Sequence, residues 1–329
     1  MKSQSCLGEF DLIEKLFAPL AAKMPGAYGL KDDAAVLNIP ATHDLVVTAD
    51  ALVEGVHFLR DDPPYAIAKK ALRVNLSDLA AKGATPHSYL LMLALPDWVD
   101  DSWLQGFVSG LEADQENFGI SLIGGDTTRT PGPLMIAITA HGIVPSGRVL
   151  RRGGARAGDI VFVTGTIGDA GAGLAVLRGE GIGLRKEKRE RLIARYRLPE
   201  PRVALGPLLI GHATAALDVS DGLLADLAHI ADVSGVRLVV EAERVPLSIP
   251  GRAFWGSKVA AIAKAASAGD DYEIAFTAPA SSRRALAELS QTHELSIREI
   301  GRVEEGAGVT FLDDEGRFFA PDRLGFTHF

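Results

Sequence analysis

The stretch Pro64–Lys82, PYAIAKKALRVNLSDLAAK, organises the first half of the chain. Five residues of this stretch are spaced in steps of four, three, four and three, namely Ile67, Ala71, Val74, Asp78 and Ala81. That spacing predicts a helix, which should end at Gly83. The segments on either side, Asp44–Ala49 and Tyr89–Leu95, are expected to be strands. Strand, helix and strand in this order, with glycine frequent at strand ends, predict an α/β fold.

Asp78 places a carboxylate on the otherwise apolar face of this helix. Burying an unpaired carboxylate is costly, so Asp78 should have a partner such as a metal ion, a cation or backbone donors. A structural salt bridge is the alternative interpretation.

Aspartate recurs beside small residues at the edges of apolar runs in six segments. These segments are Lys31–Ala35, Thr48–Asp50, Ser77–Asp78, Gly124–Arg129, Asp218–Gly222 and Gly269–Glu273. Any one of them alone is most simply a turn, because aspartate accepts hydrogen bonds from nearby backbone N–H groups. Together they offer many oxygen ligands, which hard cations such as Mg²⁺ prefer, and such ions commonly carry phosphates. The pattern therefore predicts an enzyme that handles a nucleotide.

Composition narrows the class of protein. A chain of 329 residues exceeds the size at which a single hydrophobic core stops growing, so two domains are expected. With 47% hydrophobic and 23% charged residues, the composition is typical of a soluble globular protein. The net charge of −8 argues against nucleic acid as a partner, whereas phosphate substrates remain compatible because bound metal ions reverse the local sign.

The single cysteine, Cys6, excludes an internal disulfide and a multi-thiolate metal site, and it favours the reducing cytoplasm. The segment Met1–Glu14 carries acids and lacks the apolar core of a signal peptide. Apolar runs such as Tyr89–Leu95 are far shorter than the ~20 residues of a membrane span, so no membrane partner is expected.

A basic, glycine-rich connection near residue 150 marks the expected domain boundary, which gives an N-terminal domain of residues 1–148 and a C-terminal domain of residues 149–329. Before it we expect an amphipathic first helix around Leu12–Leu20, a helix Asp100–Phe118, a strand Ile120–Ile123 and an apolar run Leu134–Val144. After it, helical and strand segments alternate over Asp159–Thr164, a helix from Ala170, Val203–Ile210, Ala215–Val219, Leu223–Val233, Val236–Val240, Lys258–Ala266, Glu273–Thr277 and Arg283–Leu289. The charged stretch Arg185–Arg197 is expected to be an exposed helix without a functional role.

The segment Asp218–Gly222 follows a short apolar strand and precedes a helix. Ser220 or Asp221 could simply cap that helix. The same position directs backbone N–H groups and the positive end of the helix dipole at a bound anion. Two carboxylates and a hydroxyl also suit Mg²⁺ held between the protein and a phosphate.

Three further features allow two readings each. The turn Gly165–Gly173 resembles a phosphate-binding loop but lacks the P-loop lysine and the dinucleotide-binding spacing, and tight strand–helix packing explains it equally well. His57 is either a base or substrate contact, or an interior histidine with satisfied hydrogen bonds, which the sequence alone favours. Arg152 is either a solvated linker charge or a phosphate clamp.

Three motifs, Asn75–Ala81 (NLSDLAA), Leu122–Arg129 (LIGGDTTR) and Asp218–Leu223 (DVSDGL), are specific when taken together. With them the chain resembles the thiamine-monophosphate kinase family, of the superfamily that includes aminoimidazole ribonucleotide synthetase. The resemblance extends from Gly8-Glu9-Phe10 to the terminal His328-Phe329.

This resemblance implies a two-domain α/β (α+β) fold. Its N-terminal domain would bind ATP and several Mg²⁺ ions and contribute strands to the core of a homodimer, and a C-terminal α/β domain would follow. The implied reaction is ATP-dependent phosphorylation of thiamine monophosphate to thiamine diphosphate. The implied metal-binding positions are Asp33, Thr48, Ala49, Asp50, Asp78, Asp126, Asp218 and Asp221. The implied nucleotide contacts are Gly125, Asp126, Arg152 and Ser220, and the implied substrate contacts are His57, Asp270 and Arg323.

Four positions depart from the family pattern. Lys31 replaces a glycine and brings a cation beside a proposed metal site. Ala49 replaces a threonine, so a metal contact there must use the backbone carbonyl. Asp270 replaces a glutamate and has a shorter reach, and Arg323 stands where an aromatic residue would stack on the substrate.

The nucleophile of the implied reaction would be a phosphate oxygen, already largely ionised near neutral pH because its second pKa is about 6. No strong general base is needed, and metal ions held by the aspartates would offset the repulsion between the two phosphates. Two alternatives remain open: another ATP-dependent enzyme of the superfamily, of the purine-synthesis type, and a catalytically inactive nucleotide-binding regulator.

Overall fold

A computed structural model of the protein describes residues 9–327, and Met1–Gly8, with Cys6, and His328-Phe329 lie outside the described residues. The chain divides into two compact units. Unit 1 ends at Gly147 and unit 2 begins at Arg148, except that the four residues Ala80–Gly83 belong to unit 2. Among residues 9–327, no helix is both long enough and apolar enough to cross a membrane.

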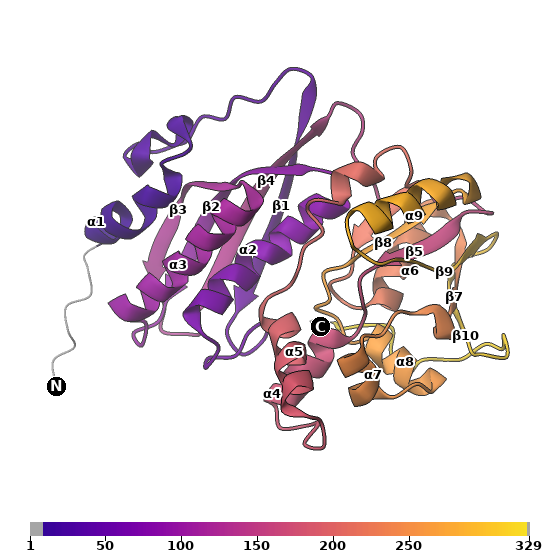
Figure 1. The fold of residues 1–329 in the computed structure, drawn as a ribbon. Helices are drawn as coiled ribbons and strands as arrows, with labels where there is room; N and C mark the ends of the chain where they lie inside the picture. Colours follow the sequence, from indigo (N-terminus) through magenta and orange to yellow (C-terminus); the bar gives the residue numbers. More distant parts are fainter. Residues whose placement is uncertain (1–8, 328–329) are drawn as a thin grey trace. The chain divides into compact units, whose positions relative to one another are not determined.

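Unit 1 is built on a four-stranded sheet with the strand order β1-β4-β2-β3, and Figure 1 shows α2 and α3 lying along it. Its elements are α1 (Glu9–Leu12), β1 (His43–Val53), α2 (Pro64–Ala81), β2 (Thr85–Leu95), α3 (Asp101–Phe118), β3 (Ser121–Arg129) and β4 (Met135–Pro145). β4 is antiparallel to both β1 and β2, whereas β2 and β3 are parallel and α3 connects them. The predicted order of strand, helix and strand around Pro64–Lys82 is confirmed.

The end of α2 and the start of α3 follow the sequence signals. Gly83 takes a left-handed conformation with φ +72°, and its N–H donates to the carbonyl of Ala80 at 2.9 Å. The side chain of Asp100 caps α3 by accepting from the N–H of Trp103 at 2.8 Å. Glycine therefore stops α2 where the sequence predicted, because only a residue without Cβ adopts this φ without strain.

The prediction of one amphipathic helix around Leu12–Leu20 is wrong. The chain instead forms α1, a π-helical turn Ile13–Phe17 and a 3₁₀ turn Ala18–Ala21. Pro19 stands at the start of the last turn and has no N–H, so α-helical hydrogen bonding cannot continue through it. The apolar spacing still has its expected effect, because Leu12, Phe17 and Leu20 are buried.

The two faces of the unit 1 sheet differ in what covers them. A Cβ on Gly142 of β4 would lie 3.2 Å from the side chain of Leu79 of α2, so that face is covered by the helix. On the opposite face, the strand register aligns four large apolar side chains, Leu45, Val47, Met92 and Met135. Their exposed fractions are 40%, 56%, 48% and 38% respectively. We call these four residues the uncovered sheet face.

Unit 2 is built on a six-stranded mixed sheet with the order β10-β7-β9-β5-β8-β6. Its strands are β5 (Ile160–Thr164), β6 (Ala215–Asp218), β7 (Arg237–Glu241), β8 (Ile274–Ala278), β9 (Ile297–Glu304) and β10 (Gly308–Leu312). Its helices are α4 (Asp169–Leu177), α5 (Lys186–Arg197), α6 (Leu223–Ser234), α7 (Ile249–Trp255), α8 (Val259–Ala266) and α9 (Arg283–Thr292). All neighbouring strands are antiparallel except β10 and β7.

Alternating residues of β5 supply two cores on the two faces of this sheet. Val161 and Val163 belong to a core that includes the apolar residues of α6. Phe162 belongs to the other core, where it stacks on Phe276 of β8 with ring centroids 5.3 Å apart. Successive side chains of β5 point to opposite faces of the sheet, and both faces are buried. Among the described elements, α7, β9 and β10 had not been predicted.

The charged stretch Arg185–Arg197 contains the predicted helix, α5, but this helix is exposed on only one side. Leu192 and Tyr196 are buried, and the side chain of Arg195 is only 12% exposed. Arg195 pairs with Glu273, whose side chain is fully buried, at 3.1 Å. One side of α5 is therefore part of the interior of unit 2.

Candidate functional site

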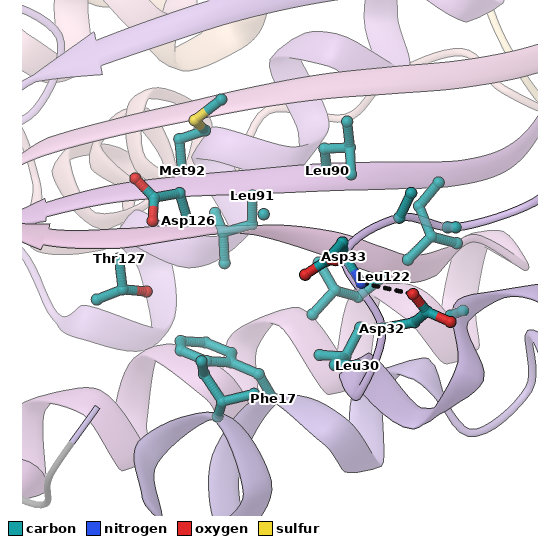
Figure 2. A pocket seen from close by; sticks show the side chains of 17 residues that line it. Phe17, Leu30, Asp32, Asp33, Leu90, Leu91, Met92, Leu122, Asp126 and Thr127 are labelled. Atoms are coloured by element: carbon teal, nitrogen blue, oxygen red, sulfur yellow. Dashed lines mark hydrogen bonds between the residues drawn. The ribbon is translucent and has the colours of Figure 1, made fainter. Parts of the chain in front are cut away.

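A pocket of about 430 Å³ opens in unit 1 beside β2 and β3. Its walls combine apolar residues of the N-terminal turns, such as Phe17 and Leu30, with Asp33 and with residues 124–127 of β3. Figure 2 shows Asp126 beside Met92, with Thr127 and Phe17 on the other side of the two strands. Three of the predicted site residues, Asp33, Gly125 and Asp126, thus line one pocket.

Local geometry explains two of the motif residues at this pocket. Asp32 accepts a hydrogen bond from the N–H of Asp33 at 2.8 Å, drawn as a dashed line in Figure 2, which is the turn role that aspartate commonly has. Gly125 has φ +153°, and a Cβ there would lie 1.7 Å from the carbonyl oxygen of Leu91. Glycine is therefore required at residue 125 by the close approach of β3 to β2.

Asp78 on α2 has a side-chain hydroxyl as a partner, a kind of partner that the sequence had not predicted. The hydroxyl of Thr48 on β1 donates a hydrogen bond to Oδ2 of Asp78. Thr48 and Asp50 alternate with Ala49 along β1. Their side chains therefore both lie on the face of the sheet that α2 covers. The sequence thus brings two predicted metal-binding residues, Thr48 and Asp78, into direct contact.

The remaining carboxylates of unit 1 do not converge on one point. The register aligns Asp126 with Met92 on the uncovered sheet face, whereas Asp50 aligns with Ile138 on the face toward α2. Two strands separate β1 from β3, which at ~4.8 Å per strand is a distance of about 14 Å between their backbones. Within residues 9–327, no three His, Cys, Asp or Glu side chains lie close enough to hold a metal ion by themselves. The predicted metal-binding carboxylates of unit 1 therefore form no cluster of three protein ligands among the described residues.

His57 is half-buried, and its hydrogen bonds define its tautomer. Its Nδ1 accepts from the N–H of Val53 at 3.0 Å, so the proton of a neutral ring lies on Nε2. Its carbonyl accepts from Nζ of the buried Lys70 at 2.8 Å. This anchoring matches the interior histidine that the sequence favoured, with the proton of the neutral ring on Nε2.

The turn between β6 and α6 holds the predicted residues of unit 2. Asp218 is 6% exposed at the end of β6, and Ser220 and Asp221 follow it in half-buried positions. The N–H groups of Ser220, Asp221 and Gly222 all donate to Oδ2 of Asp226, each at 3.1 Å. The expected capture of an external anion by these N–H groups is therefore wrong, since a carboxylate of the protein already occupies them.

Asp226 was not recognised from the sequence. It lies 3% exposed in the first turn of α6. Burial and the negative charge of Asp221 raise the pKa of Asp226 to about 7, against the lowering effect of the three backbone hydrogen bonds. Its spacing from Ser220 and Asp221 was the available signal, since a carboxylate early in a helix can reach back to the preceding turn.

Asp270 lies in a loop with unusual backbone geometry. Asp270 and Tyr272 have φ of +63° and +52°, a region that side chains other than glycine rarely adopt. The N–H groups of these two residues donate to the carbonyls of Ser220 and Val219, both at 2.8 Å. The Tyr272 hydroxyl also donates to Oδ1 of Asp270 at 3.0 Å. Such strain clusters at functional sites, which is consistent with a role for this loop.

A buried ion-pair network follows this loop directly. Glu273 accepts hydrogen bonds from Arg202 Nε at 2.6 Å, from Arg195 Nη2 at 3.1 Å and from the Thr164 hydroxyl at 2.7 Å. Arg195 also donates to the carbonyl of Asp271 at 3.3 Å. Burial raises the pKa of Asp271 well above its usual value. The network fixes the loop from its interior side.

The last predicted residues of unit 2 are exposed. Arg152 is exposed in the connection that precedes β5. Arg323 lines a second pocket, of about 310 Å³, together with Trp255, Lys264 and Phe319. The hydroxyl of Ser267 donates to the carbonyl of Arg323 at 2.8 Å, which fixes the backbone of this segment.

The glycine-rich turn Gly165–Gly173 is explained by packing. A Cβ on Gly168 would lie 2.6 Å from Cβ of Ala265 in α8, and one on Gly171 would lie 2.4 Å from Cβ of Ala268. The glycines permit this close approach, so the packing interpretation of the sequence accounts for them.

Comparison with known proteins covers both units. Residues 31–144 match the family model of the AIR synthase related protein N-terminal domain, and residues 156–314 match that of the C-terminal domain. A thiamine-monophosphate kinase of Caulobacter vibrioides is 44% identical over 324 residues, which are 97% of this chain and 90% of that protein. The chain belongs to the thiamine-monophosphate kinase family.

Solved structures agree with this family and with the predicted two-domain α/β fold. A crystal structure of thiamine-monophosphate kinase from Stenotrophomonas maltophilia matches with a TM-score of 0.84 and 42% identity, over 93% of this chain and 96% of that chain. AaThiL complexed with AMPPCP and TMP matches with a TM-score of 0.78 and 34% identity, over 100% of both chains. The family resemblance read from the three motifs is confirmed.

Proposed function

We propose that this protein catalyses the ATP-dependent phosphorylation of thiamine monophosphate to thiamine diphosphate. The observation that carries the proposal is the similarity, over the full length of both chains, to AaThiL complexed with AMPPCP and TMP. AMPPCP is an analogue of ATP, so that relative binds both reactants of the proposed transfer. The oxygen-rich, thiol-free set of proposed site residues is consistent with this chemistry.

The pocket of unit 1 is the proposed nucleotide site of that unit. Its apolar walls suit the base of a nucleotide, and Asp33 and Asp126 give it a polar, acidic side. We propose Gly125, Asp126, Arg152 and Ser220 as nucleotide contacts. The planar guanidinium of Arg152 is suited to bidentate binding of phosphate oxygens.

Mg²⁺ is the proposed cofactor, bound as several ions. The proposed ligands are Asp33, Thr48, Ala49, Asp50, Asp78, Asp126, Asp218 and Asp221. Mg²⁺ is commonly held by one or two protein carboxylates plus waters and substrate phosphates, so pairs and single carboxylates fit it without a cage of three. When bound, Mg²⁺ neutralises phosphate charge and aligns the transfer. The Thr48 hydroxyl orients the carboxylate of Asp78 for this task.

The acceptor, thiamine monophosphate, is proposed to contact His57, Asp270 and Arg323. The ring of His57 is held in a fixed orientation by the hydrogen bond that its Nδ1 accepts from the N–H of Val53. The Tyr272 hydroxyl fixes the shorter side chain of Asp270 through its bond to Oδ1. Because the attacking phosphate oxygen is ionised near neutral pH, these residues have only to bind and orient it.

A homodimer is the proposed assembly, with the uncovered sheet face as its interface. Exposed apolar side chains gathered on one face mark interaction sites, and Val47 is 56% exposed on the edge strand β1. A second copy of the chain offers the same apolar face, as an isologous interface requires. Residues 1–148 are the proposed ATP-binding, Mg²⁺-binding and dimerisation domain, and residues 149–329 the C-terminal α/β domain. The proposed compartment is the cytoplasm, where ATP is available.

A coupled assay of ADP release tests the proposed function. ADP formation that requires thiamine monophosphate and Mg²⁺ is expected, and aminoimidazole precursors should not replace the acceptor. ADP release with those precursors would favour a purine-synthesis type of enzyme. Binding of ATP without turnover would favour a nucleotide-binding regulator.

A further inference from the structure

The turn between β6 and α6 forms a cradle of three consecutive N–H groups, from Ser220, Asp221 and Gly222. All three point at one atom, Oδ2 of Asp226, at 3.1 Å. Successive N–H groups at the start of a helix are well suited to bind a phosphate or another anion. Here the anion is a side chain of the protein, 3% exposed. An external phosphate would have to displace it.

The carbonyl side of the same turn is also occupied. Each carbonyl accepts one N–H at 2.8 Å, in the pairs Val219 with Tyr272, Ser220 with Asp270, and Asp221 with Phe326. The backbone of the turn is therefore bonded on both sides within unit 2. The side chains of Ser220 and Asp221 are what the turn can present to a ligand.

The conformation of the turn depends on these bonds. Gly222 has φ +127°, and a Cβ there would lie 3.1 Å from the backbone of Ser267. Without Asp226, three N–H groups that lie in or near the interior would lack their acceptor, which favours a rearranged turn. The directions of the Ser220 and Asp221 side chains would change with it.

We propose that Asp226 is the positioning residue of the proposed Mg²⁺- and nucleotide-binding turn, acting as the internal hydrogen-bond acceptor that fixes Ser220 and Asp221. This inference rests on the proposed function, because it assigns these two residues to metal and nucleotide. It follows that the turn binds phosphate through side chains and Mg²⁺ rather than through its backbone N–H groups. The Mg²⁺ concentration that nucleotide binding requires should therefore depend on Asp226, although Asp226 contacts neither Mg²⁺ nor the nucleotide.

The test compares Asp226→Ala, Asp226→Asn and a matched control, Asp232→Asn, which removes an exposed carboxylate from the same helix. The measured quantity is the Mg²⁺ concentration that gives half-maximal binding of a nonhydrolysable ATP analogue. Asp226→Ala should raise it about 10-fold, as expected for loss of a residue that orients metal ligands. Asp226→Asn keeps an acceptor oxygen without the charge and should give a smaller increase, and Asp232→Asn should give none.

A separate thermal unfolding measurement without Mg²⁺ distinguishes positioning from stability alone. Lower thermal stability with an unchanged Mg²⁺ requirement in Asp226→Ala would overturn the inference. If Asp226→Ala does not fold, Asp226→Asn decides by the same criterion. If the wild type binds the analogue with Mg²⁺ and both Asp226 variants require the same Mg²⁺ concentration, only the role of Asp226 is refuted. A wild-type protein without Mg²⁺-dependent binding would refute the proposed function, and the inference with it.

Discussion

The hydroxyl of Thr48 on β1 donates a hydrogen bond to Oδ2 of Asp78 on α2. The bond joins two proposed metal-binding residues that are 30 positions apart in the chain. A hydroxyl that holds one oxygen of a carboxylate fixes the direction in which the group meets a cation. Removing this hydrogen bond by mutation therefore tests the proposed role of Asp78 in metal binding.

Thr48→Val removes this hydroxyl at nearly constant volume. We expect the Mg²⁺ concentration for half-maximal ADP release to rise about 10-fold, because Asp78 loses the bond that orients it. Thr48→Ser keeps a hydroxyl and should stay close to the wild type. Equal Mg²⁺ requirements for the valine and serine variants would contradict the role given to the bond.

Val47→Glu places a charge at the most exposed residue of the uncovered sheet face. Burying an unpaired carboxylate in an apolar interface is costly, so the variant should be monomeric when its mass is measured by light scattering. The control is Ile182→Glu, which adds the same charge at an apolar residue of unit 2 that is 83% exposed. The control should keep the wild-type mass. A wild-type monomer, or a dimeric Val47→Glu, would refute the proposed interface.

Glu273→Ala leaves Arg195 and Arg202 without their buried partner. The loss should lower the free energy of unfolding by about 3 kcal/mol, because the two largely buried arginines then keep only the exposed Glu200 as an ion-pair partner. Urea unfolding measures this change. Glu288→Ala, which removes the exposed partner of Arg284, should cost far less. Similar losses in the two variants would show that the Glu273 network does not stabilise unit 2.

His141 predicts a specific pH dependence of stability. Burial lowers the pKa of His141, and the nearby His87 adds to this effect, so the folded protein favours the neutral ring. Stability from this group is complete above the unfolded-state pKa of about 6.5 and is lost as the pH falls toward the lower folded-state pKa. His141→Gln should therefore flatten the fall in unfolding free energy between about pH 7.5 and 5.5. The exposed His293→Gln should leave that fall as steep as in the wild type, and a flattening as large in the control would contradict the assignment.

The sequence predicted best the features that depend on local spacing. The stripe of α2 and its end at Gly83 follow from a 3.6-residue period and from the conformational freedom of one glycine. The N-terminal helix failed because Pro19 interrupts a pattern whose apolar spacing continues through it. Elements such as β9 were not predicted.

The site was predictable as a set of residues but not as an arrangement. Asp33 and Asp126 line one pocket, as their motifs suggested, yet the strand order keeps Asp50 away from Asp126. Strand order depends on contacts between distant segments, which single-sequence patterns do not contain. The same limit hid the pairing of Arg195 with Glu273, which are 78 residues apart.

The direct test of the central claim is a measurement of products after incubation with ATP, Mg²⁺ and thiamine monophosphate, by phosphorus NMR. We expect thiamine diphosphate and ADP in equal amounts, with matching loss of thiamine monophosphate and ATP. Thiamine monophosphate that remains unchanged while the protein binds ATP would contradict it.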